Sequence, residues 1–486
     1  MPSVRRLAFP VLALSFSLAV SLAAPARVFA VTAAQSALRQ ATSPADLRAR
    51  LTTYAAGAEK SDANDAGEAW YYAGESWRRG GQPDSAIIAF RRARDLRNGY
   101  EDRYALADAL FARQAPGDVD EGVKLCRAAV TEAQVESART AARFNALLAW
   151  GELLAGDFDG SRTLFASVEA DVTREPEWRY RYGRALLTGP DIGKAIQVLR
   201  PLGVASRAQA QDVMELLQHA AERFQQTGAL DRDLADRMKA RDEIEERVVT
   251  RVQGRRIKFA ASDQFPLSAV LLEAAGGGRH RPAIVMLAPE DTLADYDSLG
   301  VALRGAGFHA LLVSPRGSGW SVAPSCPLPF AWRGREEELL RRSARDVRDA
   351  VRASALAAKA DTSGYVLIAS RSMALAGALA ASQDSRVRAL VLLSPDPNAV
   401  DRGVLTATLA KRKLPVFIQQ TMEDFLNAEV IDDAYHASVE SSSRVSDGHS
   451  GGHGAIAFKM DARVTPRFVQ WLNDALSPPR SQPRKG

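Results

Sequence analysis

The chain has 486 residues, which is longer than one ordinary domain and suggests two or three. Hydrophobic residues make up 46% and charged residues 25%, a composition that can bury a core and excludes a disordered or fibrous chain. The net charge of +5 is spread along the chain without a basic run interleaved with aromatic residues, which argues against nucleic-acid binding. The two cysteines, Cys126 and Cys326, fall in different expected domains, so a disulfide framework is not expected.

The first 30 residues have the pattern of a secretory signal peptide. Arg5 and Arg6 precede an apolar run from Leu7 to Ala24, and residues 28–30 place small side chains at the cleavage positions. An uncleaved membrane anchor is the alternative, because the apolar run is nearly long enough to span a bilayer. The small side chains at the end of the segment favour cleavage after Ala30. We therefore expect a periplasmic or secreted protein with no membrane span after cleavage.

Residues 31–225 are expected to form a helical repeat domain. Large and small residues follow one another in a fixed order at Trp70, Gly74, Trp77, Gly81, Ala86, Phe90 and Ala93. Counting Ala86 as the first, the small residues at the matching point of the four copies lie at positions 86, 122, 161 and 195, which are 36, 39 and 34 residues apart. This pattern resembles the tetratricopeptide repeat, whose period is about 34 residues. The resemblance implies antiparallel helix pairs that dock a peptide or protein partner, with Cys126 as a small buried core residue.

Residues 226–250 are expected to form a charged helical linker, after which strands and helices alternate. Strands are expected at 256–259, 267–272, 282–287, 308–313, 366–369, 387–393 and 415–419, and helices at 294–305 and 336–358. This alternation predicts a doubly wound, mostly parallel sheet with helices on both faces over residues 251–477. Residues 478–486 are expected to be a disordered tail. The predicted fold class is thus multi-domain, an all-α repeat followed by an α/β unit.

Three stretches of the α/β unit resemble the α/β-hydrolase fold, and its dienelactone hydrolase and esterase members in particular. They are the turn Pro315-Arg-Gly-Ser-Gly-Trp-Ser321, the segment Ser370-Arg-Ser-Met-Ala374, and the stretch Phe468-Val-Gln-Trp-Leu472. The resemblance implies an Arg-Gly-x-Gly-x-Ser turn, a nucleophile elbow and the last helix of the fold, in that order. Ser370 and Ala374 replace the two elbow glycines, and Ser372 is the implied nucleophile.

The resemblance also implies an acid and then a histidine after the nucleophile in the chain, because a serine hydroxyl needs an oriented base. Asp424 directly follows the apolar strand 415–419, where the family carries its acid. His453 lies in a Gly-Gly-His-Gly loop that resembles the family's histidine loop. The alternatives are Glu423 and Asp396 for the acid and His449 for the base. His449 and His453 are not expected to bind a metal, because the intervening Ser-Gly-Gly does not favour a helix.

The remaining site residues surround this triad. The backbone N–H groups of Met373 and Glu290 are the expected oxyanion donors, since Pro289 has no N–H to offer. Arg371 and Trp320 are candidates for the substrate pocket, although Arg371 could instead bond a nearby carboxylate. The Pro- and aromatic-rich stretch between Ser321 and Glu336 is expected to cover the pocket.

The sequence therefore predicts an exported serine hydrolase that acts on a small or chain-like carboxylic ester through an acyl-enzyme on Ser372. A serine peptidase or amidase is one alternative. A catalytically silent domain that binds a protein through its repeats is another, because the elbow glycines are replaced. The resemblance implies neither a metal nor an organic cofactor, and no nucleic-acid partner.

Overall fold

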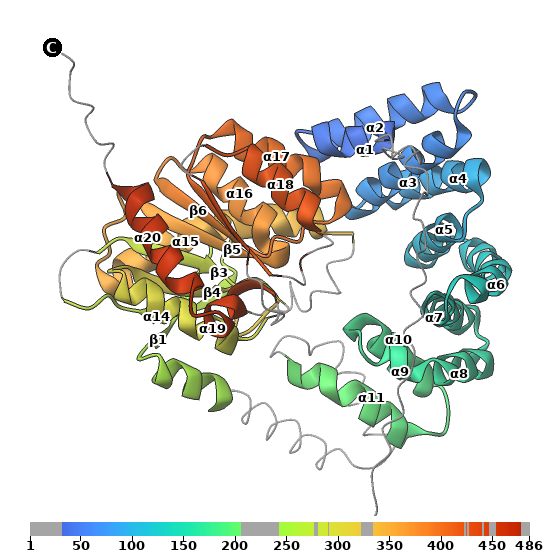
Figure 1. Ribbon diagram of the computed structural model, residues 1–486. Helices are drawn as coiled ribbons and strands as arrows, with labels where there is room; N and C mark the ends of the chain where they lie inside the picture. The colour runs from blue at the N-terminus through green and yellow to red at the C-terminus, as the bar shows by residue number, and fades with distance from the viewer. Residues whose placement is uncertain are drawn as a thin grey trace, which may run out of the picture.

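The computed structural model describes residues 32–205, 243–276, 280–289, 291–321, 334–421, 424, 427–439, 442–446 and 453–477. The predicted signal peptide and tail, and most of the predicted linker, lie outside these residues. Within the described ranges, a series of helices precedes an eight-stranded sheet that has helices packed around it (Figure 1). No helix in these ranges is long and apolar enough to cross a membrane.

The N-terminal helices follow one another in an arc that begins beside the α/β unit (Figure 1). They are α1 (Ala33–Gln40), α2 (Pro44–Ala58), α3 (Ala63–Arg79), α4 (Pro83–Arg97), α5 (Tyr100–Arg113), α6 (Asp118–Glu136), α7 (Ala138–Ala155), α8 (Phe158–Ser167), α9 (Glu169–Val172), α10 (Pro176–Leu186) and α11 (Ile192–Ala205). Gly74 of α3 makes room for Phe90 of α4, because a Cβ atom on Gly74 would lie 2.5 Å from the Phe90 ring. Cys126 is fully buried, which raises the pKa of its thiol. The repeat family itself stays a prediction.

The sheet is mostly parallel, as predicted, and is consistent with an α/β-hydrolase fold. Its strands are β1 (Arg255–Ala260), β2 (Pro266–Leu272), β3 (Pro282–Met286), β4 (His309–Ser314), β5 (Tyr365–Ser370), β6 (Val387–Leu393), β7 (Val416–Gln420) and β8 (Ser443–Ser446). Their order in space is β1-β2-β4-β3-β5-β6-β7-β8. β2 pairs antiparallel with β1 and β4, and all other pairs are parallel. β8 was not expected from the sequence.

Helices cover both faces of the sheet and so create two separate cores. The elements are η1 (Leu293–Tyr296), α14 (Asp297–Gly305), α15 (Glu336–Ala358), α16 (Ala374–Gln383), η4 (Ala399–Asp401), α17 (Arg402–Lys411), α18 (Ala428–His436), α19 (Ala457–Met460) and α20 (Val464–Leu476). Leu367 of β5 packs in one core with α15 and α16, whereas the next residue, Ile368, packs in the other with α14 and α20. This alternation explains why the central strands are largely apolar.

The first helices of the arc pack directly on the α/β unit. Val400 of η4 lies in a buried cluster formed mainly by residues of α1, α2 and α3. Arg79 of α3 forms an ion pair of 2.5 Å with Asp401 of η4, and both residues are buried. Further pairs join Arg48 to Glu337, Arg78 to Glu336 and Arg39 to Glu429. The helical region and the α/β unit therefore share an apolar interface that contains a buried ion pair.

Candidate active site

A sharp turn joins β5 to α16 at the carboxyl edge of the sheet. Ser370 is fully buried at the end of β5, and the short helical turn η3 (Arg371–Met373) follows it. Arg371 has a φ of +48°, a left-handed conformation that is uncommon for a residue with a Cβ atom. Ser372 comes next and is exposed, whereas Met373 is buried. The predicted turn is present, and the residue with the left-handed backbone is the one before Ser372.

Asp424 and His453 form a hydrogen-bonded pair close to this turn. Asp424 is 1% exposed, and its Oδ1 accepts a hydrogen bond of 2.6 Å from Nδ1 of His453. Its Oδ2 accepts hydrogen bonds from the backbone N–H of Thr421 at 2.6 Å and from the Thr421 hydroxyl at 3.3 Å. A carboxylate bound to Nδ1 fixes the imidazole tautomer and leaves Nε2 as the basic nitrogen. The pair has the chemistry of an oriented general base.

The histidine loop reaches the turn through Gly454. The His453 side chain remains 39% exposed, so a substrate can reach it. Gly454 has a φ of +70°, and a Cβ atom there would lie 2.6 Å from the Ser370 hydroxyl and 3.6 Å from Cδ of Arg371. Only glycine fits this close approach in that conformation. The loop that carries His453 is thus held against the end of β5 and the side chain of Arg371.

Arg371 connects the turn to the loop that follows β3. Its Nη1 lies 2.9 Å from Oδ1 of Asp291, whose Oδ2 accepts a hydrogen bond of 2.6 Å from the Tyr296 hydroxyl. The Tyr296 oxygen in turn accepts a hydrogen bond from the backbone N–H of Ala288 at 3.0 Å. Burial, together with Asp291, raises the pKa of Tyr296 well above its ordinary value. Of the two interpretations of Arg371, the structure shows the carboxylate pair.

Of the two predicted oxyanion donors, Met373 lies within the described residues. Met373 lies in η3 at the start of α16, where backbone N–H groups and the helix dipole favour negative charge. Glu290 lies outside the described residues, between Pro289 and Asp291. Because Asp291 is bound to both Arg371 and Tyr296, the backbone beside Glu290 is tied to the turn.

Two of the other residues that the sequence offered as candidates, Trp320 and Asp396, lie within the described residues. Trp320 is buried, and the guanidinium of Arg256 stacks 4.0 Å above its ring. Asp396 is exposed and accepts a hydrogen bond of 3.1 Å from the Asn427 amide. Glu423, His449, Cys326 and residues 322–333 lie outside the described residues. In the described part of the chain, no group of three or more His, Cys, Asp or Glu residues could hold a metal ion.

The turn after β4 has a structural function. Arg316 is 2% exposed and forms paired hydrogen bonds with Asp346 of α15, both of 2.6 Å, and with Asp263, of 2.8 and 2.9 Å. These bonds keep the pKa of Asp263 below its usual range. Arg316 also stacks on Phe265, with its guanidinium carbon 4.6 Å from the ring centre. This motif joins β4, α15 and the β1–β2 turn.

Ser394 is a site residue that the sequence did not indicate. It follows β6, and its hydroxyl donates to Oδ2 of Asp424 at 2.6 Å. The hydroxyl oxygen of Ser394 accepts a hydrogen bond of 2.8 Å from the backbone N–H of Gly454. Asp424 is 30 residues away in sequence and Gly454 is 60 residues away, so no local pattern could have pointed to Ser394.

No protein-family model and no curated protein matches the chain. Among solved structures, an esterase from Pyrococcus furiosus is similar at 11% identity, covering 46% of this chain and 91% of the esterase, with a TM-score of 0.35. An esterase domain of a Rhodothermus marinus protein is similar at 14% identity over 46% of this chain and 98% of that domain, also with a TM-score of 0.35. An α/β hydrolase from a Penicillium species is similar at 14% identity over 46% of this chain and 98% of that hydrolase, with a TM-score of 0.34. Likenesses of this size identify no activity for this chain.

Proposed function

We propose that the chain is a serine hydrolase that cleaves carboxylic esters through an acyl-enzyme on Ser372. The observation that carries the proposal is the hydrogen bond of 2.6 Å between Asp424 and His453, beside the strand-to-helix turn that bears Ser372. A buried carboxylate on Nδ1 makes Nε2 of a partly exposed imidazole available as a base. The serine, the acid and the histidine also come in the chain order of the α/β-hydrolase family.

In the proposed reaction His453 accepts and then donates one proton in each of the two half-reactions, acylation and deacylation. Its Nε2 takes the proton of the Ser372 hydroxyl while the serine oxygen attacks the ester carbonyl carbon. The backbone N–H groups of Met373 and Glu290 stabilise the negative oxygen of the tetrahedral intermediate, a contribution worth about 10²- to 10³-fold in kcat per donor. Asp424 stabilises the imidazolium. His453 then protonates the departing alcohol. In deacylation His453 takes a proton from the attacking water and returns it to the Ser372 oxygen as the carboxylic acid leaves.

A catalytically silent domain is the second candidate, and one observation favours it. In the α/β-hydrolase elbow, the strained position of the turn belongs to the nucleophile. In this chain the left-handed residue of the turn is Arg371, and its side chain is ion-paired with Asp291. A domain of this kind would serve a protein partner bound by the helical region. A peptidase or amidase would use the same three side chains and differs only in the leaving group.

Labelling with a fluorophosphonate separates these candidates, because only an activated serine reacts with it. We expect the wild-type protein to be labelled on the peptide that contains Ser372, and Ser372→Ala to abolish labelling. Ser382→Ala is the matched control, since Ser382 lies on α16, the helix that follows the turn, and its hydroxyl donates to the carbonyl of Leu379 on that helix. A folded wild-type protein that is not labelled would favour the silent domain. Labelling that persists in Ser372→Ala would show that a residue other than Ser372 is the nucleophile.

Export remains part of the proposal and rests on the apolar run before Ala30. N-terminal sequencing of the protein recovered from its native cells tests it. A chain that begins at residue 31 supports a periplasmic or secreted enzyme, and an intact N-terminus would support a membrane anchor instead.

A further inference from the structure

The carboxyl end of β6 has an unusual backbone next to the Asp424–His453 pair. Ser394 is 1% exposed and has a φ of +45°, and its backbone N–H donates a hydrogen bond of 2.8 Å to the carbonyl of Gln419 on β7. A left-handed conformation in a buried residue other than glycine is unfavourable. Surrounding contacts must therefore hold it in place.

The contacts that hold it involve both members of the pair. A hydroxyl has one hydrogen to donate and two lone pairs to accept with. Ser394 uses its hydrogen for Oδ2 of Asp424 and a lone pair for the N–H of Gly454, the residue after His453. The Ser394 oxygen thus bonds the carboxylate of Asp424 and, at the same time, the backbone N–H directly after His453.

The two oxygens of Asp424 consequently have different partners. Oδ2 receives hydrogen bonds from Ser394 and from two groups of Thr421, while Oδ1 pairs with His453. Without the hydroxyl of Ser394, the carboxylate loses one of the contacts that set its rotation. The N–H of Gly454 also loses its acceptor in a buried place, and an unsatisfied buried donor is unfavourable.

We propose that Ser394 is a positioning residue that fixes the orientation of the Asp424–His453 pair from both ends. Its hydroxyl sets the rotation of the Asp424 carboxylate and also fastens the loop that carries His453. The catalytic consequence rests on the proposed ester hydrolysis, whereas the structural consequence can be measured whether or not the protein is an enzyme.

The test compares four variants in the full chain. Ser394→Gly removes the hydroxyl and tolerates the left-handed backbone, and Ser394→Ala removes the hydroxyl alone. Ser442→Ala is the matched control, because Ser442 is a buried serine whose hydroxyl also accepts a backbone N–H, that of Val416, at a distance of 2.9 Å. Ser394→Cys, which keeps a weak donor, supplies a further folded variant if the first two unfold.

The first readout is the proton resonance of His453 Nδ1–H, which a short hydrogen bond to a carboxylate moves downfield of the amide region. We expect this resonance in the wild-type protein and in Ser442→Ala, a loss or upfield shift in Ser394→Gly and Ser394→Ala, and an intermediate shift in Ser394→Cys. An unchanged resonance in folded Ser394 variants would overturn the proposal. Its absence from the wild-type protein would also do so, because the hydrogen bond to be positioned would not exist.

The second readout is kinetic. For ester turnover we expect the Ser394 variants to lower kcat about 10- to 100-fold with little change in KM, as is usual for partners that orient a catalytic group. Equal losses in Ser442→Ala would contradict a specific role. If the wild-type protein has no esterase activity, the proposed function fails, and the proton resonance still decides whether Ser394 positions the pair.

Discussion

At the residue scale, Arg371 and Ser394 are the only described residues other than glycine that have a left-handed φ and are not exposed, and both lie where the chemistry is proposed. Arg371, Ser394 and Gly454 all have left-handed φ angles, and each lies at or next to the Asp424–His453 pair. Residues in such conformations persist only where their surroundings hold them, and they are common at functional sites. Here the surroundings are an ion pair to Asp291 and the hydroxyl contacts of Ser394.

Gly454→Ala should disrupt the site more than it disrupts the fold. The new Cβ atom would lie 2.6 Å from the Ser370 hydroxyl in a backbone conformation with a φ of +70°, so the loop must move and carry His453 away. We expect fluorophosphonate labelling to slow about 100-fold, since a displacement of about 1 Å can cost that much. Gly156→Ala is the control, because its φ is +87° and open space surrounds it. Equal labelling rates in the two variants would contradict this prediction.

His309 gives stability a pH dependence. It is 4% exposed at the start of β4, and burial, with His280 nearby, lowers its pKa. The unfolded chain therefore binds a proton first as the pH falls through about 6.5, so stability is fully present above that pH and declines below it. We expect a lower urea midpoint at about pH 5.5 than at about pH 7.5. His309→Gln should reduce this difference, and a difference of the same size in that variant would contradict the assignment.

At the element scale, the sequence predicted the regular structure well. The apolar runs became β3, β4, β5, β6 and β7, because a strand covered on both faces is apolar at most positions. The sequence did not predict β8 because Ser443–Ser446 is short, mostly polar and at the sheet edge. The sequence named Asp424 and His453, which the structure brings together. It could not indicate Ser394, nor identify Asp291 as the carboxylate that pairs with Arg371, because these contacts join residues far apart in the chain.

The Ala/Leu helix α16 lies against β5 through small residues, and this packing should override helix propensity. A Cβ atom on Gly377 would lie 2.5 Å from the Cβ of Ala369. We expect Gly377→Ala to lower the free energy of unfolding by about 1–3 kcal/mol, although alanine is the better helix former. Gly57→Ala in α2 should instead raise it by about 0.5–1 kcal/mol, because nothing lies within 4 Å of that position. Urea unfolding of both variants checks the pair. Stabilisation by Gly377→Ala would contradict the packing argument.

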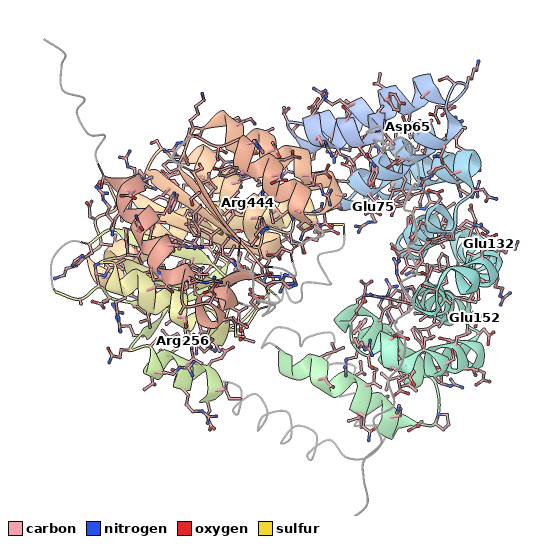
Figure 2. All side chains as sticks on the ribbon, in the orientation of Figure 1. Asp65, Glu75, Glu132, Glu152, Arg256 and Arg444 are labelled. Atoms are coloured by element: carbon pink, nitrogen blue, oxygen red, sulfur yellow. The ribbon has the colours of Figure 1, made fainter. Side chains whose placement is uncertain are left out.

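At the scale of the whole molecule, the helical arc is anchored to the α/β unit at its N-terminal end (Figure 1). Figure 2 shows Glu75 on the part of the arc that approaches the α/β unit and Glu132 and Glu152 farther along it. The sequence separates the two regions because its pattern changes near residue 251. Their interface depends on pairs such as Arg79 and Asp401, which no local pattern connects. Deleting the arc would expose the apolar surface around Val400.

Asp401→Ala should destabilise the molecule strongly because it leaves the buried Arg79 guanidinium without its counter-ion. Breaking a buried pair in this way costs about 3–5 kcal/mol. Asp159→Ala removes the partner of Arg162 at an exposed position, where the Asp159 side chain is 92% exposed, and should have no measurable effect. Equilibrium unfolding in urea measures both. Equal midpoints in the two variants would contradict a buried ion pair at the interface.

The most direct test of the central claim is a pre-steady-state burst with p-nitrophenyl acetate. Acylation of Ser372 should release p-nitrophenol in a rapid phase that approaches one equivalent per chain, followed by slower turnover limited by deacylation. Ser372→Ala should abolish the rapid phase while its urea midpoint stays close to that of the wild-type protein. The absence of a burst from the folded wild-type protein, or a burst that survives in Ser372→Ala, would contradict an acyl-enzyme on Ser372.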